Sequence, residues 1–378
     1  MRIAIVAEVF LPKVDGVVNR TVHLIQQLLR CDDEVMVLCP QAEGRGHCPV
    51  LVVEVPSFSF PLYPEYRIGL PDDRLIPVLE RFRPDVLHYV NPFAFGFRCY
   101  DLIHRAGFRI PSVFSFHTLY GEFVKQYKLL RPLAHLLWWL TREYHNRAGM
   151  NLTVSKVALE DLERRGFQRV RFWPPAVDSK LFHPRQKSPT MRARLAQGHP
   201  DKQLLLTVSR LAPEKSVSFL AEMLDRFPHA CLAVVGDGPQ RDELERRFAG
   251  RNANFIGYLR GADLAAAYAS ADAFVYASET ETMGNVVLEA MAMGRPVVAS
   301  QWPGLAELIV DGETGYLVPP GDKVALARQT RLLLENAGRR QQFGEAGRLR
   351  AGNRFTVEDL VRRHVELYQS PPGDGTQA

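Results

Sequence analysis

The sequence predicts an α/β fold made of two domains, each with a doubly wound parallel sheet. The first observation is that apolar runs of strand length alternate with helix-length stretches along nearly the whole chain, which is the pattern of repeated β-α units. The second is the Pro-rich stretch 173–184, which interrupts this alternation and is typical of a linker. The third is the length of 378 residues, which is long for one core and fits two domains.

The first domain is predicted to span residues 1–178. Its predicted strands are 2–7, 34–39, 50–55, 85–90, 111–116, 150–154 and 170–173. Helical stretches fall between most of these runs, and the first of them is predicted at 20–30. A parallel sheet covered by helices is therefore expected.

The second domain is predicted to span residues 179–355. The alternation restarts after a polar, basic stretch that ends near residue 203. The predicted strands are 204–208, 230–235, 253–258, 273–277, 296–299 and 316–318. The final segment, 356–378, is expected to hold a helix at 357–368 and then a disordered tail, because its end is rich in Pro and Gly.

Composition narrows the class of protein. The chain is 46% hydrophobic and 24% charged, which is typical of a globular protein, and no apolar run reaches the roughly 18 residues of a membrane span. The five cysteines show no close metal-ligand spacing, so reduced thiols in a cytoplasmic protein are expected. The net charge of +5 suits phosphate-bearing substrates or an anionic membrane surface, and no nucleic-acid motif is present.

One βαβ unit in the second domain carries the pattern of a ligand site. An acidic loop follows the predicted strand 273–277, and a helix pattern at 286–293 follows the loop. The backbone amides of Met283, Gly284 and Asn285 open this helix, and a helix N-terminus attracts anions. Glu281 precedes the helix, and Glu289 lies roughly 7 Å further along its axis. Because carboxylates bind vicinal diols, this arrangement suits a nucleotide sugar, with phosphates in the middle and hydroxyl-rich groups at both ends.

Further site residues follow other predicted strands of the second domain. Arg210 and Lys215 lie at a helix entry, where two cations can hold a diphosphate and stabilise the charge that grows on it as a sugar leaves. Gly257 and Tyr258 end another strand, and their backbone groups are candidates to contact the base. The pair Gly236 and Gly238 is interpreted mainly as turn chemistry.

Two candidates lie in the first domain. Gly16 precedes the predicted first helix and permits a close approach of the backbone to a phosphate. His117 follows the predicted strand 111–116, at the end where parallel sheets bind ligands. A neutral imidazole can both donate and accept hydrogen bonds, although a buried histidine bonded to a carbonyl group is an alternative interpretation.

The stretch from Ser278 to Pro296 resembles the E-x7-E motif of the retaining GT-B glycosyltransferases of family 4. The resemblance implies a GT-B fold, with two Rossmann-like domains facing a cleft and the last helix crossing back to the first domain. It also implies that the loop at Gly16 closes over the donor phosphates and that His117 contacts the transferred sugar or the acceptor. Arg210 and Lys215 match the cation pair that the family places on the diphosphate.

The resemblance implies a retaining transfer of a hexose from a nucleoside diphosphate sugar, with UDP as the expected nucleotide, to a hydroxyl group. His117, Arg210, Lys215 and Glu281 are the predicted catalytic residues. The helix dipoles and the two cations can stabilise the negative charge of the diphosphate, as a metal ion does in other enzymes. No metal or other cofactor is therefore expected. Within the family, the chain is most similar to sulfoquinovosyldiacylglycerol synthases and related glycolipid-forming enzymes.

A lipid acceptor such as diacylglycerol is therefore expected, with a peripheral contact on the cytoplasmic face of a membrane. The segment 123–140 interleaves Lys125, Lys128 and Arg131 with apolar residues and ends in Trp138 and Trp139, which suits an anionic membrane surface. A helix packed in the core is the alternative for 136–140. Alternatives for the function are transfer to a lipopolysaccharide or exopolysaccharide precursor, or nucleotide-sugar binding without transfer. The sequence leaves open the sugar, the nucleotide, the acceptor and the oligomeric state.

Overall fold

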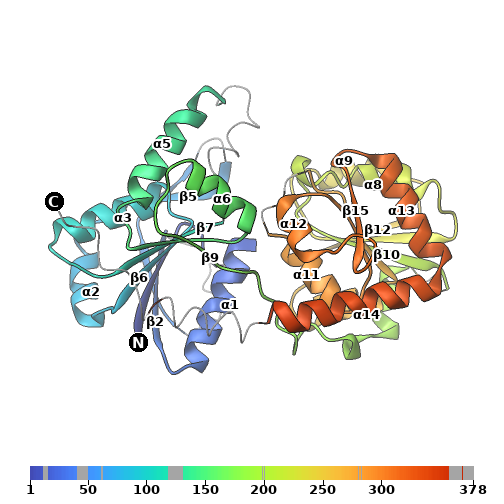
Figure 1. The fold of residues 1–378 in the computed structure, drawn as a ribbon, viewed down its shortest axis with the longest axis horizontal. Coiled ribbons are helices and arrows are strands. Elements are labelled where there is room, and N and C mark those ends of the chain that lie inside the picture. Colours follow the sequence, from blue (N-terminus) through green and yellow to red (C-terminus); the bar gives the residue numbers. More distant parts are fainter. Residues whose placement is uncertain are drawn as a thin grey trace. The chain divides into compact units, whose positions relative to one another are not determined.

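The computed structural model describes residues 1–11, 16–40, 50–60, 63–117, 131–197, 199, 201–279, 281, 283–356 and 368. The chain divides into two compact units (Figure 1). Unit 1 comprises Met1–Pro174 and Val361–Ala378, and unit 2 comprises Pro175–Leu360. The expected domain boundaries, after residues 178 and 355, lie a few residues from these divisions.

Unit 1 contains a seven-stranded sheet in the order β3-β2-β1-β6-β7-β8-β9. Every neighbouring pair is parallel. The strands are β1 (Arg2–Ala7), β2 (Glu34–Pro40), β3 (Leu51–Val55), β6 (Val86–Val90), β7 (Ser112–Phe116), β8 (Met150–Thr153) and β9 (Val170–Phe172). The prediction of a doubly wound parallel sheet is confirmed, and the strand order reverses between β1 and β6, where such sheets bind ligands.

The helices of unit 1 are α1 (Gly16–Arg30), α2 (Leu75–Phe82), α3 (Ala94–Arg105), α5 (Ala134–His145) and α6 (Lys156–Arg164), with a short 3₁₀ turn η1 (Arg131–Leu133) before α5. The first helix begins four residues before the predicted start at 20, because Gly16 is already helical. An antiparallel hairpin, β4 (Ser57–Phe60) and β5 (Tyr63–Gly69), was not predicted. The prolines in its sequence resemble turn signals and hide the alternating aromatic pattern.

Unit 2 contains a six-stranded sheet in the order β12-β11-β10-β13-β14-β15. Its neighbouring strands are also parallel, and the order reverses between β10 and β13. The strands are β10 (Gln203–Val208), β11 (Ala230–Val235), β12 (Ala253–Gly257), β13 (Ala273–Tyr276), β14 (Val297–Ser300) and β15 (Gly315–Val318). All six lie within one or two residues of the predicted positions.

Two layers of helices cover the sheet of unit 2. Leu204 and Leu206 of β10 belong to one hydrophobic cluster, whereas Leu205 belongs to a second cluster on the opposite face. Successive side chains of a strand point to opposite faces, so both faces are buried, and this explains why the strands are continuous apolar runs. The helices are α7 (Pro189–Leu195), α8 (Phe219–Leu224), α9 (Arg241–Arg247), α10 (Gly261–Ser270), α11 (Asn285–Ala292), α12 (Pro303–Leu308), α13 (Lys323–Glu335) and α14 (Ala337–Arg354).

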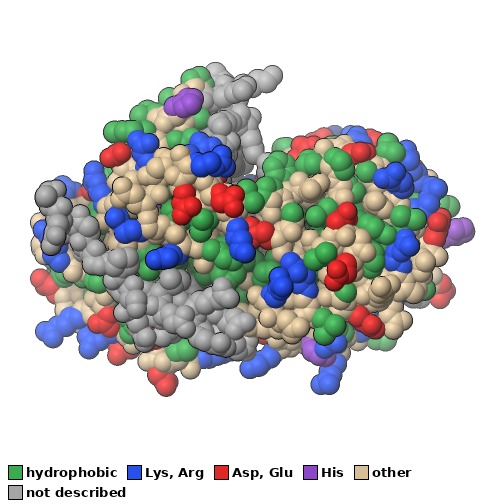
Figure 2. Space-filling view, viewed as in Figure 1, with side chains coloured by type: hydrophobic (Ala, Val, Ile, Leu, Met, Phe, Trp, Pro, Cys, Tyr) green, Lys and Arg blue, Asp and Glu red, His purple; other side chains and the backbone are tan. Residues whose placement is uncertain are grey.

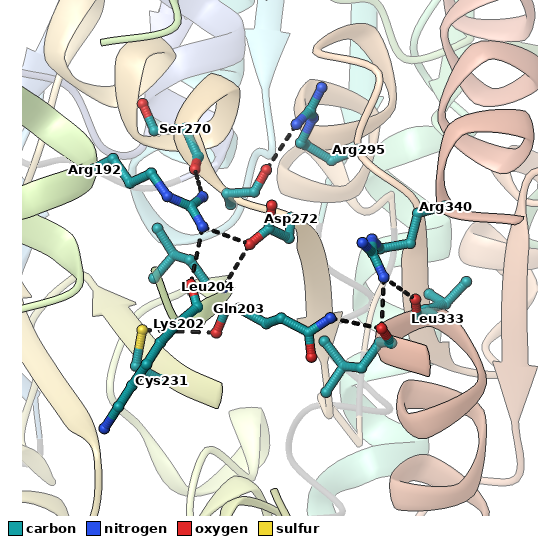
Figure 3. Close-up of polar contacts among 12 residues, drawn as sticks. Arg192, Lys202, Gln203, Leu204, Cys231, Ser270, Asp272, Arg295, Leu333 and Arg340 are labelled. Atoms are coloured by element: carbon teal, nitrogen blue, oxygen red, sulfur yellow. Dashed lines mark hydrogen bonds and ion pairs between the residues drawn. The ribbon is translucent and has the colours of Figure 1, made fainter. Parts of the chain in front are cut away.

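A network of ion pairs and hydrogen bonds anchors α7 to the amino-terminal edge of this sheet (Figure 3). Arg192 donates to Asp272 Oδ2 at 2.9 Å and to the carbonyl oxygen of Ser270 at 2.8 Å. The same carboxylate oxygen accepts from the amide of Leu204 at 2.7 Å. The charged groups at this edge therefore have structural partners. The opposite edge, where the strands end, holds the candidate site residues of unit 2.

Candidate functional site

Four loops meet at the carboxyl edge of the sheet in unit 2. The amide of Leu211 donates to Asp237 O at 2.9 Å, and the amide of Gly236 donates to Gly257 O at 2.9 Å. The amide of Glu279 donates to Glu214 O at 2.9 Å. These bonds join the loops that follow β10, β11, β12 and β13 into one rim. The rim carries the predicted site residues Arg210, Lys215, Gly257, Tyr258, Glu281, Met283 and Gly284, and the helix that follows it, α11, carries Asn285 and Glu289.

The glycines after β11 allow two of these loops to touch. A Cβ atom at Gly236 would lie 1.9 Å from the carbonyl oxygen of Ser209, and the φ angle of Gly236 is +128°. A Cβ atom at Gly238 would lie 2.5 Å from the carbonyl oxygen of Leu211. Both distances are too short for any residue with a Cβ atom. The two glycines therefore allow the loop after β11 to pack against the loop after β10, in addition to forming the turn.

The start of α11 is shaped by Gly284, which has a φ angle of +71°. A Cβ atom there would lie 2.2 Å from Leu305 Cδ2, so only glycine fits. None of the described side chains forms a cap hydrogen bond at this helix start. The amide of Met283, one of the predicted anion donors, donates to Glu281 Oε1 at 3.3 Å. The amides that begin at Asn285 point along the helix axis toward the rim, as at any helix N-terminus.

Lys215, Tyr276 and Glu281 form a largely buried polar cluster. Lys215 Nζ lies 3.1 Å from Glu281 Oε2 and 3.2 Å from the hydroxyl of Tyr276. The same hydroxyl donates to Glu281 Oε2 at 2.5 Å. Lys215 is therefore a largely buried cation and not a solvated surface charge. Tyr276 was missed by the sequence analysis, because a tyrosine in a buried strand has the same pattern as any apolar strand residue.

The cluster keeps Lys215 and Glu281 ionised. Burial alone lowers the pKa of Lys215, but the Tyr276 and Glu281 oxygens outweigh this effect and raise that pKa above its ordinary value. Burial alone raises the pKa of Glu281, but the charge of Lys215 and the Tyr276 hydrogen bond bring it below its ordinary value. A permanent positive charge is therefore held in the rim, next to the start of α11.

Glu289 lies in α11 and pairs with a different tyrosine. The hydroxyl of Tyr268, a fully buried residue of α10, donates to Glu289 Oε2 at 2.8 Å. Burial raises the pKa of Glu289 to about 7, and the hydrogen bond from Tyr268 only partly offsets this rise. Glu289 is therefore a carboxyl group that changes its protonation near neutral pH. Tyr268, its hydrogen-bond partner, was not indicated by the sequence analysis.

The remaining predicted residues of unit 2 lie on the same rim. Arg210 lies between β10 and the 3₁₀ turn η3 (Pro213–Lys215) and is partly exposed. Gly257 ends β12 with a φ angle of +79°, and its carbonyl oxygen accepts a hydrogen bond from the amide of Gly236. The side chain of Tyr258 is 52% exposed, and its hydroxyl donates to Asp237 O at 3.2 Å. An aromatic ring of this kind is a flat surface on which a base can stack.

His117 lies in unit 1, directly after β7. Its Nε2 lies 3.1 Å from Ser115 Oγ, and its amide donates to the side-chain oxygen of Asn91 at 3.1 Å. Burial, with smaller effects from Arg20 and His88, lowers the pKa of His117 well below its ordinary value. The imidazole is therefore neutral at physiological pH. Gly16 is the exposed first residue of α1 in the same unit.

Trp173 requires a correction of the predicted linker, which was placed to begin at this residue. Its side chain is only 1% exposed, and it packs edge-on against His117, with ring centroids 5.5 Å apart. The guanidinium carbon of Arg20 lies 3.6 Å from the centre of the indole ring. Burial lowers the pKa of Arg20 to about 9. Trp173 and Arg20 thus belong to the surroundings of His117, which a Pro-rich sequence context did not reveal.

The predicted membrane segment is only partly described. Lys125 and Lys128 lie outside the described residues, and Arg131 begins η1. In α5, Trp138 is 8% exposed, whereas Leu136 and Trp139 are 56% and 52% exposed. Figure 2 shows hydrophobic side chains at the surface in the region where Figure 1 places α5. The helix therefore has one face in the core and an apolar face toward solvent. Among the described residues, none of the helices is long and apolar enough to cross a membrane.

No group of three or more side chains suited to hold a metal ion occurs among the described residues.

Comparison with known proteins identifies relatives across the chain. Residues 14–181 match the family described as Glycosyltransferase Family 4, and residues 202–336 match that described as Glycosyl transferases group 1. The chain is 36% identical to sulfoquinovosyl transferase SQD2 of Arabidopsis thaliana, over 89% of this chain and 67% of that protein. It is 38% identical to a GDP-mannose-dependent alpha-mannosyltransferase of Mycolicibacterium smegmatis, over 92% of each. Its fold is similar to that of Alr3699/HepE from Anabaena, solved with UDP and glucose, with a TM-score of 0.79, 20% identity and coverage of 97% of this chain and 99% of that one.

Proposed function

The chain belongs to glycosyltransferase family 4, and we propose that it transfers a hexose from a nucleoside diphosphate sugar to a hydroxyl group of a membrane lipid, with retention of configuration. Its GT-B fold and its glycosyltransferase relatives are the premise. The observation that carries the proposal is the Lys215–Glu281 pair, held largely buried in the loops that lead to the start of α11. A fixed cation and a helix N-terminus in one rim make a binding site for a diphosphate.

The donor is assigned to the rim of unit 2. Arg210, Lys215 and the first amides of α11 hold the diphosphate. Glu289 accepts hydrogen bonds from the ribose diol, since a carboxylate has two oxygens that match adjacent hydroxyl groups. Tyr258 and Gly257 lie where the base binds. The two relatives with similar identity are named for different sugars, so the nucleotide and the sugar are left to experiment.

The proposed chemistry needs positive charge where the leaving diphosphate becomes more negative. Lys215 supplies it, because its raised pKa keeps it protonated throughout the reaction. Arg210 and the N-terminus of α11 add to this charge, so we propose that no metal is required. Attack from the face that the diphosphate leaves retains the configuration, and a phosphate oxygen takes the proton of the acceptor hydroxyl. Glu281 and the neutral imidazole of His117 orient sugar hydroxyl groups.

A lipid acceptor is supported by the surface of α5. Leu136 and Trp139 are more than half exposed, and apolar and aromatic residues in such positions enter the interface of a membrane. The match to a protein named alpha-monoglucosyldiacylglycerol synthase, from Acholeplasma laidlawii, fits a glycolipid product. Transfer to a polysaccharide precursor and binding without transfer remain the alternatives that the experiment must separate.

The test is an assay of the purified protein with a panel of labelled UDP- and GDP-sugars, using vesicles that contain diacylglycerol as acceptor. We expect one donor to give a labelled lipid whose anomeric configuration, determined by NMR, matches that of the donor. Activity should survive EDTA. Hydrolysis or binding without any labelled lipid would contradict the proposal, and activity that is lost in EDTA and restored by a divalent metal would contradict the metal-independent part.

A further inference from the structure

Four buried side chains of unit 1 form a continuous chain of hydrogen bonds that ends at His117. The hydroxyl of Tyr368 lies 2.6 Å from His88 Nδ1, and His88 Nε2 lies 2.9 Å from Ser115 Oγ. Ser115 Oγ in turn lies 3.1 Å from His117 Nε2. His88 and Ser115 are fully buried, and Tyr368 is 1% exposed. The chain of groups is thus shielded from water, and it joins a residue near the end of the sequence to a predicted site residue.

The protonation of the two histidines limits how these hydrogen bonds are directed. Burial lowers the pKa of His88 to about 3 and that of His117 well below its ordinary value, so both rings are neutral and each carries a single N–H. The Ser115 hydroxyl has one proton to donate. If it accepted from both Nε2 atoms, its buried proton would have no acceptor, because no described residue other than the two histidines is hydrogen-bonded to this hydroxyl. It therefore donates to one of the two Nε2 atoms and accepts from the other. Only two arrangements are therefore consistent, and they differ in the tautomer of His117.

The contact at Tyr368 selects between the two arrangements. Hydrogen bonds from O–H donors are typically about 2.5–3.0 Å long, whereas those from N–H donors are about 2.7–3.2 Å long. The 2.6 Å contact between Tyr368 and His88 Nδ1 falls in the range of an O–H donor. A phenol is also the more acidic partner and the imidazole nitrogen the more basic one. Tyr368 therefore donates to His88, and the proton of His88 lies on Nε2.

We propose that Tyr368 sets the tautomer of His117 through His88 and Ser115, so that His117 presents an N–H donor at Nδ1. His88 Nε2–H donates to Ser115, Ser115 donates to His117 Nε2, and the proton of His117 is left on Nδ1. None of the described residues forms a hydrogen bond with His117 Nδ1, so this donor is available to a ligand. The assignment of that ligand rests on the proposed function, in which His117 contacts the transferred sugar or the acceptor. Tyr368, His88 and Ser115 are then positioning residues.

The packing of Trp173 supports this arrangement. Its ring lies 5.7 Å from the ring of His88 and 5.5 Å from the ring of His117, measured between centroids. One large buried side chain thus limits the rotation of both imidazoles. With the rings held in place, reversing the direction of the hydrogen bonds changes the tautomer by moving protons only, while the heavy atoms stay where they are.

The experiment measures the tautomer of His117 by ¹⁵N NMR of the whole protein labelled at its histidines, with a His117→Gln variant to assign the signals. Wild-type protein should show the proton of His117 on Nδ1. Tyr368→Phe keeps the ring but removes the donor, and it should shift the tautomer ratio of His117 toward Nε2–H about tenfold, the effect of one net hydrogen bond. Tyr100→Phe is the matched control, because its hydroxyl bonds to Arg147 O and does not join the relay.

A second variant tests the middle of the relay. Ser115→Ala should make the tautomer of His117 insensitive to Tyr368→Phe. The proposal is overturned if wild-type His117 carries its proton on Nε2, or if Tyr368→Phe leaves the ratio unchanged while the protein stays folded. Failure of the proposed function has a different signature, namely a normal tautomer response in a protein that transfers no sugar. Where transfer is measurable, Tyr368→Phe should lower kcat in proportion to the lost Nδ1–H population and leave the KM of the donor within about twofold.

Discussion

Lys215 and Glu281, two residues of the proposed donor site, form a buried ion pair within unit 2 alone. Their side chains are 20% and 15% exposed, and Tyr276 donates to the oxygen of Glu281 that Lys215 also contacts. A bound diphosphate would compete with Glu281 for Lys215. We expect Tyr276 then to keep a donor on Glu281, so that the carboxylate is not left buried and unpaired.

Lys215→Ala should lower kcat roughly 10²-fold, with a much smaller effect on donor binding, because the charge on the leaving diphosphate grows mainly in the transition state. The substitution also leaves a buried carboxylate without its cation, which lowers stability. The double variant Lys215→Ala/Glu281→Gln should recover thermal stability but not kcat. A change confined to KM would contradict the role of Lys215.

Glu289 makes stability depend on pH. The pKa of Glu289 is about 7 in the folded protein, above its ordinary value of 4.5. The folded protein therefore binds this proton more tightly than the unfolded chain does. As a result, the free energy of unfolding falls as the pH rises from about 4.5 through about 7. At about 1.4 kcal/mol per pKa unit, the effect is on the order of 3 kcal/mol. Glu289→Gln should therefore melt close to wild type at pH 5 and several degrees higher at pH 8. Equal differences at both pH values would show that Glu289 is not buried in this way.

The same variant should bind free UDP or GDP at least about tenfold more weakly by calorimetry, because it loses charge-assisted hydrogen bonds to the ribose. A gain in stability together with a loss of binding would identify a carboxylate that is retained for its ligand. Unchanged affinity in the folded variant would reject the ribose assignment.

At the scale of elements, α5 has both a core face and an exposed apolar face. Leu136→Ser and Trp139→Ser should together weaken binding to vesicles of anionic lipid about tenfold or more. Each substitution removes an apolar side chain whose transfer from water into the membrane interface contributes to the binding free energy. Leu349→Ser is the matched control, because Leu349 is 65% exposed but lies in α14 of unit 2. Binding should also fall with ionic strength if Lys125, Lys128 and Arg131 contribute. Binding is measured by vesicle sedimentation. Equal sedimentation of wild type, double variant and control would reject α5 as the surface that docks on the membrane.

The loops of the rim depend on close contact between backbones. Gly236→Ala places a Cβ atom where only 1.9 Å separates it from the carbonyl oxygen of Ser209, so the loop must shift. Gly250→Ala is a matched control, because Gly250 also has a positive φ angle, +78°, but no atom lies within 4 Å of the added carbon. The control should cost about 1–2 kcal/mol from the φ angle alone, and Gly236→Ala should cost clearly more and weaken nucleotide binding. Equal melting temperatures for the two variants would contradict this explanation.

At the scale of the whole molecule, each unit has a sheet and a hydrophobic core of its own. The residues that we propose bind the donor, Arg210, Lys215, Glu281 and Glu289, all belong to unit 2. A ligand stabilises only the part that binds it, by an amount that grows with its concentration relative to Kd. In scanning calorimetry, UDP or GDP should therefore raise the transition of unit 2 more than that of unit 1. Hydrogen exchange can assign the transitions, and protection that appears first in unit 1 would contradict the division of roles.

The sequence by itself determined the two parallel sheets, all of their strands, and the loop from Ser278 to Pro296. These features follow from local patterns, because a strand buried on both faces must be apolar throughout and a tight helix start needs glycine. The hairpin of β4 and β5 and the helix α7 escaped prediction. Their prolines and polar residues give the same local signal as loops.

The tertiary structure alone decided which residues surround the predicted ones. Tyr276 and Tyr268 have the pattern of core residues, yet their hydroxyl groups hold Glu281 and Glu289. Tyr368 lies 280 positions from His88, and no local pattern connects them. The pKa of a buried carboxyl group or histidine depends on its burial and on partners that are distant in the sequence. Both exist only once the chain has folded.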